Sequence, residues 1–324
     1  MVWFMRTFIA ALLCTVSYES LANKTSRKKI LIPQGTFTMG CTGCDIEDAL
    51  PLHKVSLDSF WISETPVTNK EFRVFVKETS YVTTAEKKLD PRDFPGVPVE
   101  KLRAGSTVFR KPDIFKGLHN PLSWWEFRYG ANWKKPAGSK GGAAKDEYPV
   151  VHVSYLDAVQ YCKWAGGRLP TEAEFEYAAR GGLEGKKYAW GDSKKPEGKW
   201  VANIWQGLFP MKNKKEDGYE GLSPVKAFPP NGYKLYDMGG NVWQWVEDWY
   251  RPDYYRELKK AGVAKNPKGP TESFDPQEPG VPKKVQKGGS HLCADNYCTR
   301  FYVGSRGKGE ISTGSGHLSF RCAW

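Results

Sequence analysis

Two cysteines near the C-terminus have the type and spacing to do chemistry. The chain reads Lys287-Gly288-Gly289-Ser290-His291-Leu292-Cys293, and Cys298 follows after four intervening residues. Thiolates bind soft metal ions, and two neighbouring thiols can also close a disulfide. In an oxidising compartment the spacing alone favours a structural disulfide. A pair left free would form a small metal or redox site behind the Gly-Gly-Ser turn.

A second pair, Cys41-Thr42-Gly43-Cys44, has the spacing of a redox motif or of half a zinc site. No further cysteine pair lies nearby in the sequence to complete a zinc site. We therefore expect a small loop disulfide here. A thiol-disulfide enzyme that uses Cys41 and Cys44 stays open as an alternative.

The first 22 residues have the features of a secretory signal peptide. Arg6 precedes an apolar run from Phe8 to Val16, and Ser20-Leu21-Ala22 offers a small-x-small cleavage site. The run is too short to span a bilayer, so we expect no membrane span. The mature protein is expected in the periplasm or outside the cell, or in the lumen of the secretory pathway if the source is eukaryotic. Residues 23–30 form a polar leader.

Composition points to one globular domain over residues 31–324. The 324 residues include 13 Trp, 16 Tyr and 16 Phe, enough for a sizeable core. The formal charge of +12 comes from lysines scattered in short clusters, which favours a solvated surface over a nucleic-acid site. No fixed-period repeat and no linker divide the chain. We expect a monomer that binds no nucleic acid.

Regular elements are few, which predicts an α+β domain with low regular secondary structure. Alternating residues predict strands within 30–40 and 55–62. Capping boxes predict helices that begin after Thr68, running to about Glu78, and after Thr171, ending at Gly181-Gly182. Ser154 is the expected cap of a further helix that ends at Gly166-Gly167. Residues 85–148 are predicted to be long surface loops, and the chain after 183 short strands with little helix.

At this level of detail the chain resembles the formylglycine-generating enzymes, also called sulfatase-modifying factors. The resemblance runs from about Ile32 to Cys322. It rests on several blocks in order: Gly35-Thr36-Phe37-Thr38-Met39-Gly40, Gly130-Ala131-Asn132-Trp133, Arg168-Leu169-Pro170-Thr171-Glu172-Ala173-Glu174, Ala202-Asn203-Ile204-Trp205-Gln206-Gly207, Gly240-Asn241-Val242-Trp243 and Lys287-Gly288-Gly289-Ser290. It implies a single loop-rich domain related to the C-type-lectin fold.

The same superfamily contains iron-dependent and non-catalytic branches. The iron branch uses a helix-borne histidine pair, whereas no two of the five histidines here are three or four residues apart. The resemblance instead implies the copper branch, in which Cys293 and Cys298 hold Cu(I). A non-catalytic extracytoplasmic binding or assembly protein of the same fold is the alternative.

By resemblance, the substrate is a cysteine in an extended Cys-x-Pro-x-Arg segment of an unfolded sulfatase polypeptide, and dioxygen is the co-substrate. The product is Cα-formylglycine. Cys293, Cys298 and Ser290 are the expected catalytic residues. Trp243, Arg300, Arg306 and His317 are expected to bind the substrate. His317, Tyr302 and Gly304 depart from the residues of animal members, which puts the exact substrate motif in question.

The resemblance also implies structural bonds and ions. Cys162 and Cys322 are expected to form a disulfide. Calcium is expected at a first site made by Asn203, Ile204, Asp217 and Tyr219. A second site would use Asp237, Gly240 and Val242, but Gln244 replaces a glutamate of the family there, so its occupancy stays open.

Overall fold

The computed structural model describes residues 27–93 and 95–324, so the expected signal peptide (1–22) and most of the polar leader lie outside the described residues. Within those two ranges no helix is long and apolar enough to cross a membrane. The chain forms four small sheets and four α-helices in this part, joined by long irregular segments.

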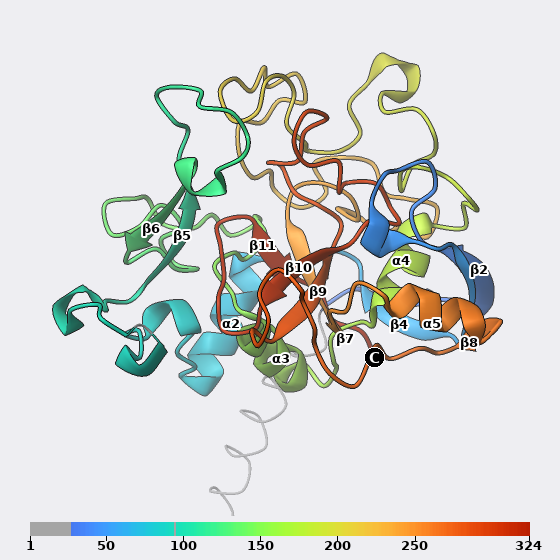
Figure 1. The fold of residues 1–324 in the computed structure, drawn as a ribbon, viewed down its shortest axis with the longest axis horizontal. Coiled ribbons are helices and arrows are strands. Elements are labelled where there is room, and N and C mark those ends of the chain that lie inside the picture. Colours follow the sequence, from blue (N-terminus) through green and yellow to red (C-terminus); the bar gives the residue numbers. More distant parts are fainter. Residues whose placement is uncertain (1–26, 94) are drawn as a thin grey trace, which may run out of the picture.

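A four-stranded sheet lies at the centre of the molecule (Figure 1). Its order is β10 (Gly307–Glu310), β9 (Lys283–Lys287), β7 (Trp243–Trp249) and β11 (Leu318–Phe320). The β11 strand runs parallel to β7, and the other neighbours are antiparallel. The segment that carries Cys293 and Cys298 connects β9 to β10 and is therefore held at both ends by this sheet.

The N-terminal region supplies two further sheets, as the alternating sequence predicted. One pairs β1 (Lys29–Ile32) with β4 (Phe60–Ser63), and the other has the order β2 (Gly35–Met39), β3 (His53–Leu57), β8 (Val263–Lys265). Because β8 comes from far along the sequence, this sheet ties the two ends of the domain together.

Three helices begin where the sequence predicted. The helices α2 (Asn69–Thr79), α3 (Tyr155–Trp164) and α4 (Glu172–Arg180) follow Thr68, Ser154 and Thr171, and each has a complete capping box. In such a box the cap hydroxyl and the third helical carboxylate satisfy backbone N–H groups that the helix leaves unpaired. A short fourth helix, α5 (Tyr254–Lys260), lies beside β3 and β8.

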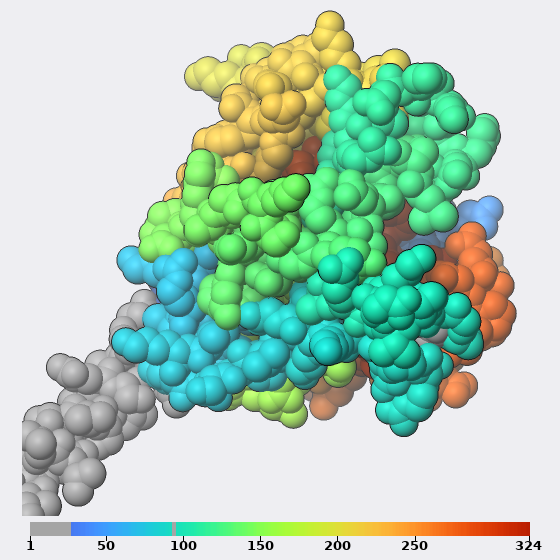
Figure 2. Space-filling view, turned by 90° about the vertical axis from the view of Figure 1, so that its left-hand side faces the viewer, coloured from blue at the N-terminus to red at the C-terminus, as the bar shows by residue number. Residues whose placement is uncertain are grey.

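The prediction for residues 85–148 was wrong in part. This region contains an antiparallel hairpin of β5 (Gly105–Phe109) and β6 (Trp125–Tyr129). The hairpin stands at the side of the central sheet (Figure 1), and residues of this region cover much of the face seen in Figure 2. The long connection 110–124 separates the strands in sequence, and β6 has no buried residue to create an alternating pattern. Short 3-10 turns complete the described chain at Glu47–Ala49, Thr84–Glu86, Pro91–Asp93, Val99–Lys101, Pro121–Ser123 and Pro196–Gly198.

The helix α4 is buried along its whole length, including its charged side chains. It packs against β2, β7 and β9. A helix with three glutamates can be buried only if each carboxylate is paired. Glu172 pairs with Arg306, Glu174 with Arg168, and Glu176 with Lys287 and Arg180.

Candidate functional site

Cys293 and Cys298 lie side by side without a disulfide bond. Their sulfur atoms are 2.7 Å apart, and both thiols are free. Cys293 is buried and Cys298 is partly exposed. A disulfide bond length is about 2.05 Å, so the two side chains need only small movements either to close a disulfide or to open around one ion. The structure therefore leaves the pair available for chemistry.

Backbone hydrogen bonds fix the turn that carries the pair. The Cys293 N–H donates to the Ser290 carbonyl at 2.9 Å, and the Cys298 N–H donates to the Ala294 carbonyl at 2.9 Å. Gly289 has φ +68°, and a Cβ there would lie 2.8 Å from the Phe301 nitrogen. Only glycine fits this close approach. The Gly-Gly-Ser turn thus packs closely against Arg300 and Phe301, which follow Cys298.

The two thiols have different proton affinities. Burial, and then the neighbouring Cys298, raise the pKa of Cys293 well above its usual range. A hydrogen bond with Cys293, together with the backbone N–H and the positive charge of Arg300, lowers the pKa of Cys298. The pair thus holds a single negative charge most readily on the sulfur of Cys298, which is the more exposed of the two.

The pair lines a cleft of about 1240 Å³. Ser290, Trp243, His317 and Arg300 line the same cleft, as the sequence predicted for residues near the site. A cleft of this size can take an extended peptide segment rather than only a small molecule. The described residues thus bring six of the seven predicted catalytic and substrate-binding residues to one place.

Ser290 connects the thiol pair to His317. Its backbone N–H points to the Cys293 sulfur at 3.4 Å, and its hydroxyl accepts the Leu292 N–H at 3.2 Å. The same hydroxyl lies 3.3 Å from Nδ1 of His317, whose ring edge contacts Trp125. Burial lowers the pKa of His317 to about 3, so its imidazole is neutral at physiological pH.

The seventh residue, Arg306, is not among the residues that line the cleft, so the structure gives no support to its predicted substrate-binding role. Its side chain is fully buried and forms two hydrogen bonds with the carboxylate of Glu172. It is unable to reach a bound peptide without breaking this pair. Arg300, in contrast, is partly exposed and contacts Asp48 at 3.4 Å.

Both expected disulfides are present. Cys162 and Cys322 join α3 to the segment after β11, and Cys41 and Cys44 close a four-residue loop after β2. With these bonds formed, Cys293 and Cys298 are the free cysteines of the described chain.

The donor set of the pair fits a soft monovalent cation such as Cu(I), because two thiolates are sufficient for a near-linear site. In residues 27–93 and 95–324 no three side chains of His, Cys, Asp or Glu gather as a metal site. A third ligand for an ion at Cys293 and Cys298 would therefore come from a bound molecule.

The first predicted calcium set is brought together and fits a hard cation. The Asp217 carboxylate accepts the N–H groups of Ile204 and Tyr219, and Asn203 lies beside them. Burial raises the pKa of Asp217, and no Lys or Arg in the described chain pairs with it. A carboxylate with no cationic partner is a suitable calcium donor. The Ile204 carbonyl of this set accepts a hydrogen bond from the Gln206 side chain, which an ion would have to displace.

The second predicted set fits calcium poorly. The Asp237 carboxylate already accepts hydrogen bonds from Lys226 and Asn241. Gln244, where the family has a glutamate, donates to the Asp237 carbonyl, and its own oxygen accepts from Arg321 at 2.6 Å. A buried guanidinium thus takes up the oxygen that an ion would need. Gly240 and Val242 are in place, but the missing carboxylate is not replaced.

Sequence reasoning missed two groups of cleft residues. Trp125 was missed with its hairpin, and the segment from Asp45 to Asp48 was missed because it carries no motif. The Trp124-Trp125 pair was an available signal, since neighbouring tryptophans in a polar segment are unusual in a solvated loop. Nothing in the sequence indicated that residues 45–48 lie against the Cys298 segment.

Comparisons with known proteins agree with this geometry. The model of the sulfatase-modifying factor enzyme 1-like domain matches residues 17–324. The formylglycine-generating enzyme of Streptomyces coelicolor is 43% identical over 306 residues, which cover 93% of this chain and 90% of that protein. The inactive C-alpha-formylglycine-generating enzyme 2 of Mus musculus is 45% identical over 224 residues, 68% of each chain. Among solved structures, PvdO of Pseudomonas aeruginosa shares the fold with a TM-score of 0.57 and 23% identity, covering 91% of this chain and 93% of that one.

Proposed function

The chain belongs to the sulfatase-modifying factor enzyme 1-like family, and from this we propose that it is an oxidoreductase that converts a cysteine of a sulfatase polypeptide to Cα-formylglycine. The proposed substrate segment is Cys-x-Pro-x-Arg, the cofactor is Cu(I) and the co-substrate is dioxygen. The observation that carries the proposal is the free thiol pair on the wall of a cleft large enough for a peptide.

Cys293 and Cys298 would hold the copper ion, which when bound supplies affinity for a third thiolate and reactivity toward dioxygen. The protein's own residues prepare this site. The pKa of Cys298 is lowered by its hydrogen bond with Cys293, and the Ser290 N–H points to the sulfur of Cys293. Trp243 is nearly buried and forms an apolar wall, which excludes water from the reacting sulfur.

Bound calcium at Asn203, Ile204, Asp217 and Tyr219 is part of the proposal. The Ile204 segment borders the thiol pair directly, since the Trp205 N–H donates to the Cys293 carbonyl at 2.9 Å. An ion there would fix the loop on which the pair rests. We propose that the mature protein is an exported monomer that meets its substrate before the substrate has folded.

A peptide assay tests the activity. A Cys-x-Pro-x-Arg peptide is incubated with protein, copper, a thiol reductant and air, and mass spectrometry follows the replacement of CH2–SH by CHO. We expect product with the natural sequence and none with Cys293→Ser or Cys298→Ser. Cu(I) titration of the reduced protein should give a one-to-one complex that either substitution abolishes.

A non-catalytic protein of the same fold is the rival, because one relative is named inactive. Failure to bind Cu(I) and to form the aldehyde, with a folded and reduced protein, would favour that rival. Activity that survives Cys293→Ser but is lost with Cys41→Ser would instead point to a thiol-disulfide enzyme.

A further inference from the structure

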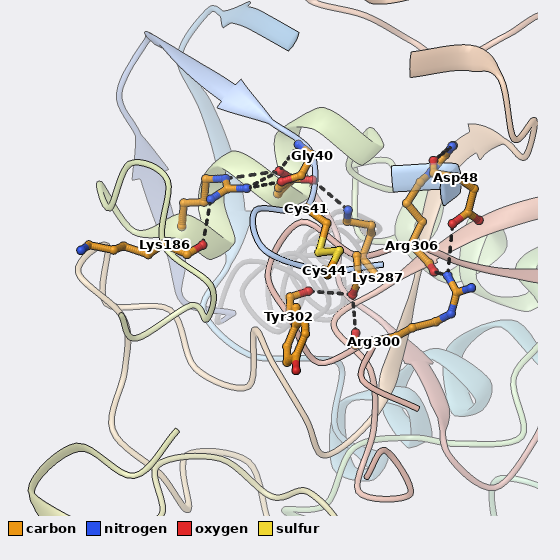
Figure 3. The surroundings of a disulfide bond; sticks show 12 residues. Gly40, Cys41, Cys44, Asp48, Lys186, Lys287, Arg300, Tyr302 and Arg306 are labelled. Carbon is orange, nitrogen blue, oxygen red and sulfur yellow. Dashed lines mark hydrogen bonds and ion pairs between the residues drawn. A yellow bond between two sulfur atoms is a disulfide. The ribbon is translucent and has the colours of Figure 1, made fainter. Parts of the chain in front are cut away.

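The Cys41–Cys44 disulfide has no role in the proposed reaction, yet it closes the loop that leads directly into Asp45, Ile46, Glu47 and Asp48, which line the cleft. It closes the loop between β2 and the 3-10 turn at Glu47–Ala49 (Figure 3). The two sulfurs differ in access, because Cys41 is 2% exposed whereas Cys44 is partly exposed. A pair with one accessible sulfur can react with a thiol from solvent, which attacks the exposed sulfur and releases the buried one.

Both ends of the loop are held by bonds that do not depend on the disulfide. At one end the Gly40 N–H donates to Glu176 at 2.9 Å, and the Gly40 carbonyl accepts from Arg180 at 2.8 Å. The Cys41 N–H also donates to the Ala49 carbonyl at 3.1 Å. Opening the disulfide would therefore leave this end of the loop in place.

Asp48 anchors the other end. Its carboxylate accepts from the Tyr250 hydroxyl at 2.8 Å and contacts Arg300 at 3.4 Å, and its carbonyl accepts from Arg306 at 2.8 Å. Figure 3 shows Asp48, Arg300 and Arg306 together on one side of the disulfide. Two of these three partners, Arg300 and Arg306, belong to the chain that follows Cys298, so the loop is held against the segment that carries the thiol pair.

Between the two anchors, Ile46 is buried and its carbonyl accepts the Ala49 N–H at 3.0 Å, whereas the acidic side chains beside it are unpaired in the described chain. Asp45, Ile46 and Glu47 line the cleft beside Cys298 and Arg300. The carboxylates of Asp45 and Glu47 are exposed and have no hydrogen bond or ion pair with any described residue. The disulfide is thus the main covalent restraint on this part of the cleft wall.

Tyr302 and Gly304, the two residues after Cys298 that depart from those of animal members, both contact this loop. Tyr302 and Cys44 both pack against the small cluster of Cys41, Ile46 and Ala49. Gly304 lies against Gly40 and Cys41, and a Cβ at Gly304 would lie 2.7 Å from the Cys41 Cα. The chain after Cys298 is therefore shaped to receive the disulfide loop.

We propose that Cys41 and Cys44 form a second redox site, a thiol-disulfide exchange site for low-molecular-weight thiols. Its reduction loosens residues 42–47, of which 45–47 line the cleft, and weakens polypeptide binding. The binding part rests on the proposed function, and the exchange part does not. In the exchange, a thiolate attacks the Cys44 sulfur, the disulfide bond breaks, and Cys41 leaves as a thiolate. A second thiol then attacks the mixed disulfide, which frees Cys44. Two thiols are oxidised to one disulfide, and the pair gains two electrons and two protons.

Redox titration of the full chain tests the exchange, with Cys162–Cys322 as an internal control. The protein is equilibrated in glutathione buffers of increasing reducing strength, free thiols are alkylated, and peptides are quantified by mass spectrometry. We expect Cys41 and Cys44 to open while Cys162 and Cys322, both fully buried, stay closed and circular dichroism is unchanged. Opening of both disulfides together, or only on unfolding, would overturn the exchange site.

Hydrogen exchange and peptide binding test the effect on the wall. On reduction, amides 42–47 should exchange faster while amides 299–306 do not change. A peptide with serine in place of the reacting cysteine should bind several-fold more weakly to the reduced protein and to the C41S/C44S variant, because the loosened wall must be ordered on binding. Equal exchange and equal affinity in all states would refute the coupling. If the peptide binds in no state, the proposed substrate is wrong, and the alkylation and exchange results still decide the redox site.

Discussion

Arg306 and Glu172 form an ion pair at the centre of the molecule in which both side chains are at most 1% exposed, with Nε–Oε1 at 2.8 Å and Nη2–Oε2 at 2.9 Å. The pair joins the chain after the thiol turn to α4. It therefore belongs to the scaffold of the site rather than to its surface.

Removing one partner of this pair should greatly lower the free energy of unfolding of the domain. We expect Arg306→Met to lower the free energy of unfolding by about 3–5 kcal/mol, because Glu172 would be left charged and buried. Lys186→Ala, which removes the exposed pair with Asp192, should change it by about 1 kcal/mol or less. Denaturant unfolding measures both. Similar effects of the two substitutions would contradict the burial of the Arg306 pair.

The two disulfides should stabilise the fold to very different degrees. The chain-entropy model gives about 5 kcal/mol for a bridge with the sequence separation of Cys162 and Cys322, 160 residues, and about 2 kcal/mol for the Cys41–Cys44 loop. Urea unfolding of C162S/C322S and C41S/C44S gives the comparison. An equal loss in both double variants would show that loop length does not decide their contributions.

Acid should destabilise the protein because His152 and His291, like His317, are held in the neutral form by burial. Burial lowers the pKa of His152 and of His291 to about 4, and each ring bonds a backbone carbonyl. An unfolded histidine binds a proton near pH 6.5, so between pH 6.5 and 4 the unfolded chain holds more protons than the folded one. The contribution of these histidines to the free energy of unfolding is therefore fully present above pH 6.5. It falls between pH 6.5 and 4 by about 1.4 kcal/mol per pH unit for each histidine.

The His152→Asn variant tests this assignment. Asparagine tolerates the positive φ of 59° at position 152, so the slope of stability against pH can be compared in a folded protein. We expect a shallower slope than in the natural chain. His119→Asn, at an exposed position, should leave the slope unchanged. A slope unaltered by His152→Asn would argue against a buried neutral histidine there.

Ser290→Ala should lower the turnover of the peptide substrate without changing Cu(I) affinity. The hydroxyl contacts His317 and Leu292 and also interacts with the Cys293 thiol, and the Ser290 backbone N–H, which the substitution keeps, points to the same sulfur. Loss of one hydrogen bond of 0.5–1.5 kcal/mol predicts a fall in kcat/KM of roughly tenfold or less. Ser290→Thr should restore part of it. A matching loss of copper affinity would place the effect on the thiol pair instead.

Chelation should distinguish the two candidate calcium sets. If the Asp217 set binds calcium, a chelator should lower Tm, since an ion at a hundredfold excess over its Kd stabilises by about 2.7 kcal/mol. Asp217→Asn should abolish the chelator effect, and Asp237→Asn should not. Thermal unfolding with and without chelator checks both. A chelator effect lost only with Asp237→Asn would reverse the assignment.

Local sequence predicted the parts of the fold that depend on neighbours in the chain. The capping boxes at Thr68 and Thr171 and the cap at Ser154 placed three helix starts, because a cap and the backbone group it bonds lie close together in sequence. The β5–β6 hairpin escaped prediction, because its strands are separated by a long connection and its outer strand is not buried.

The sequence by itself determined the chemistry available to this protein: a Gly-Gly-Ser turn followed by two cysteines, and a resemblance that assigns them a role. Only the tertiary structure decided which residues share the cleft. It buried Arg306 against Glu172, kept Arg300 at the cleft, and brought the Cys41–Cys44 loop against the chain after Cys298. These outcomes depend on contacts between residues more than a hundred positions apart. Burial and charge pairing between such distant residues leave no pattern in the local sequence from which they could be predicted.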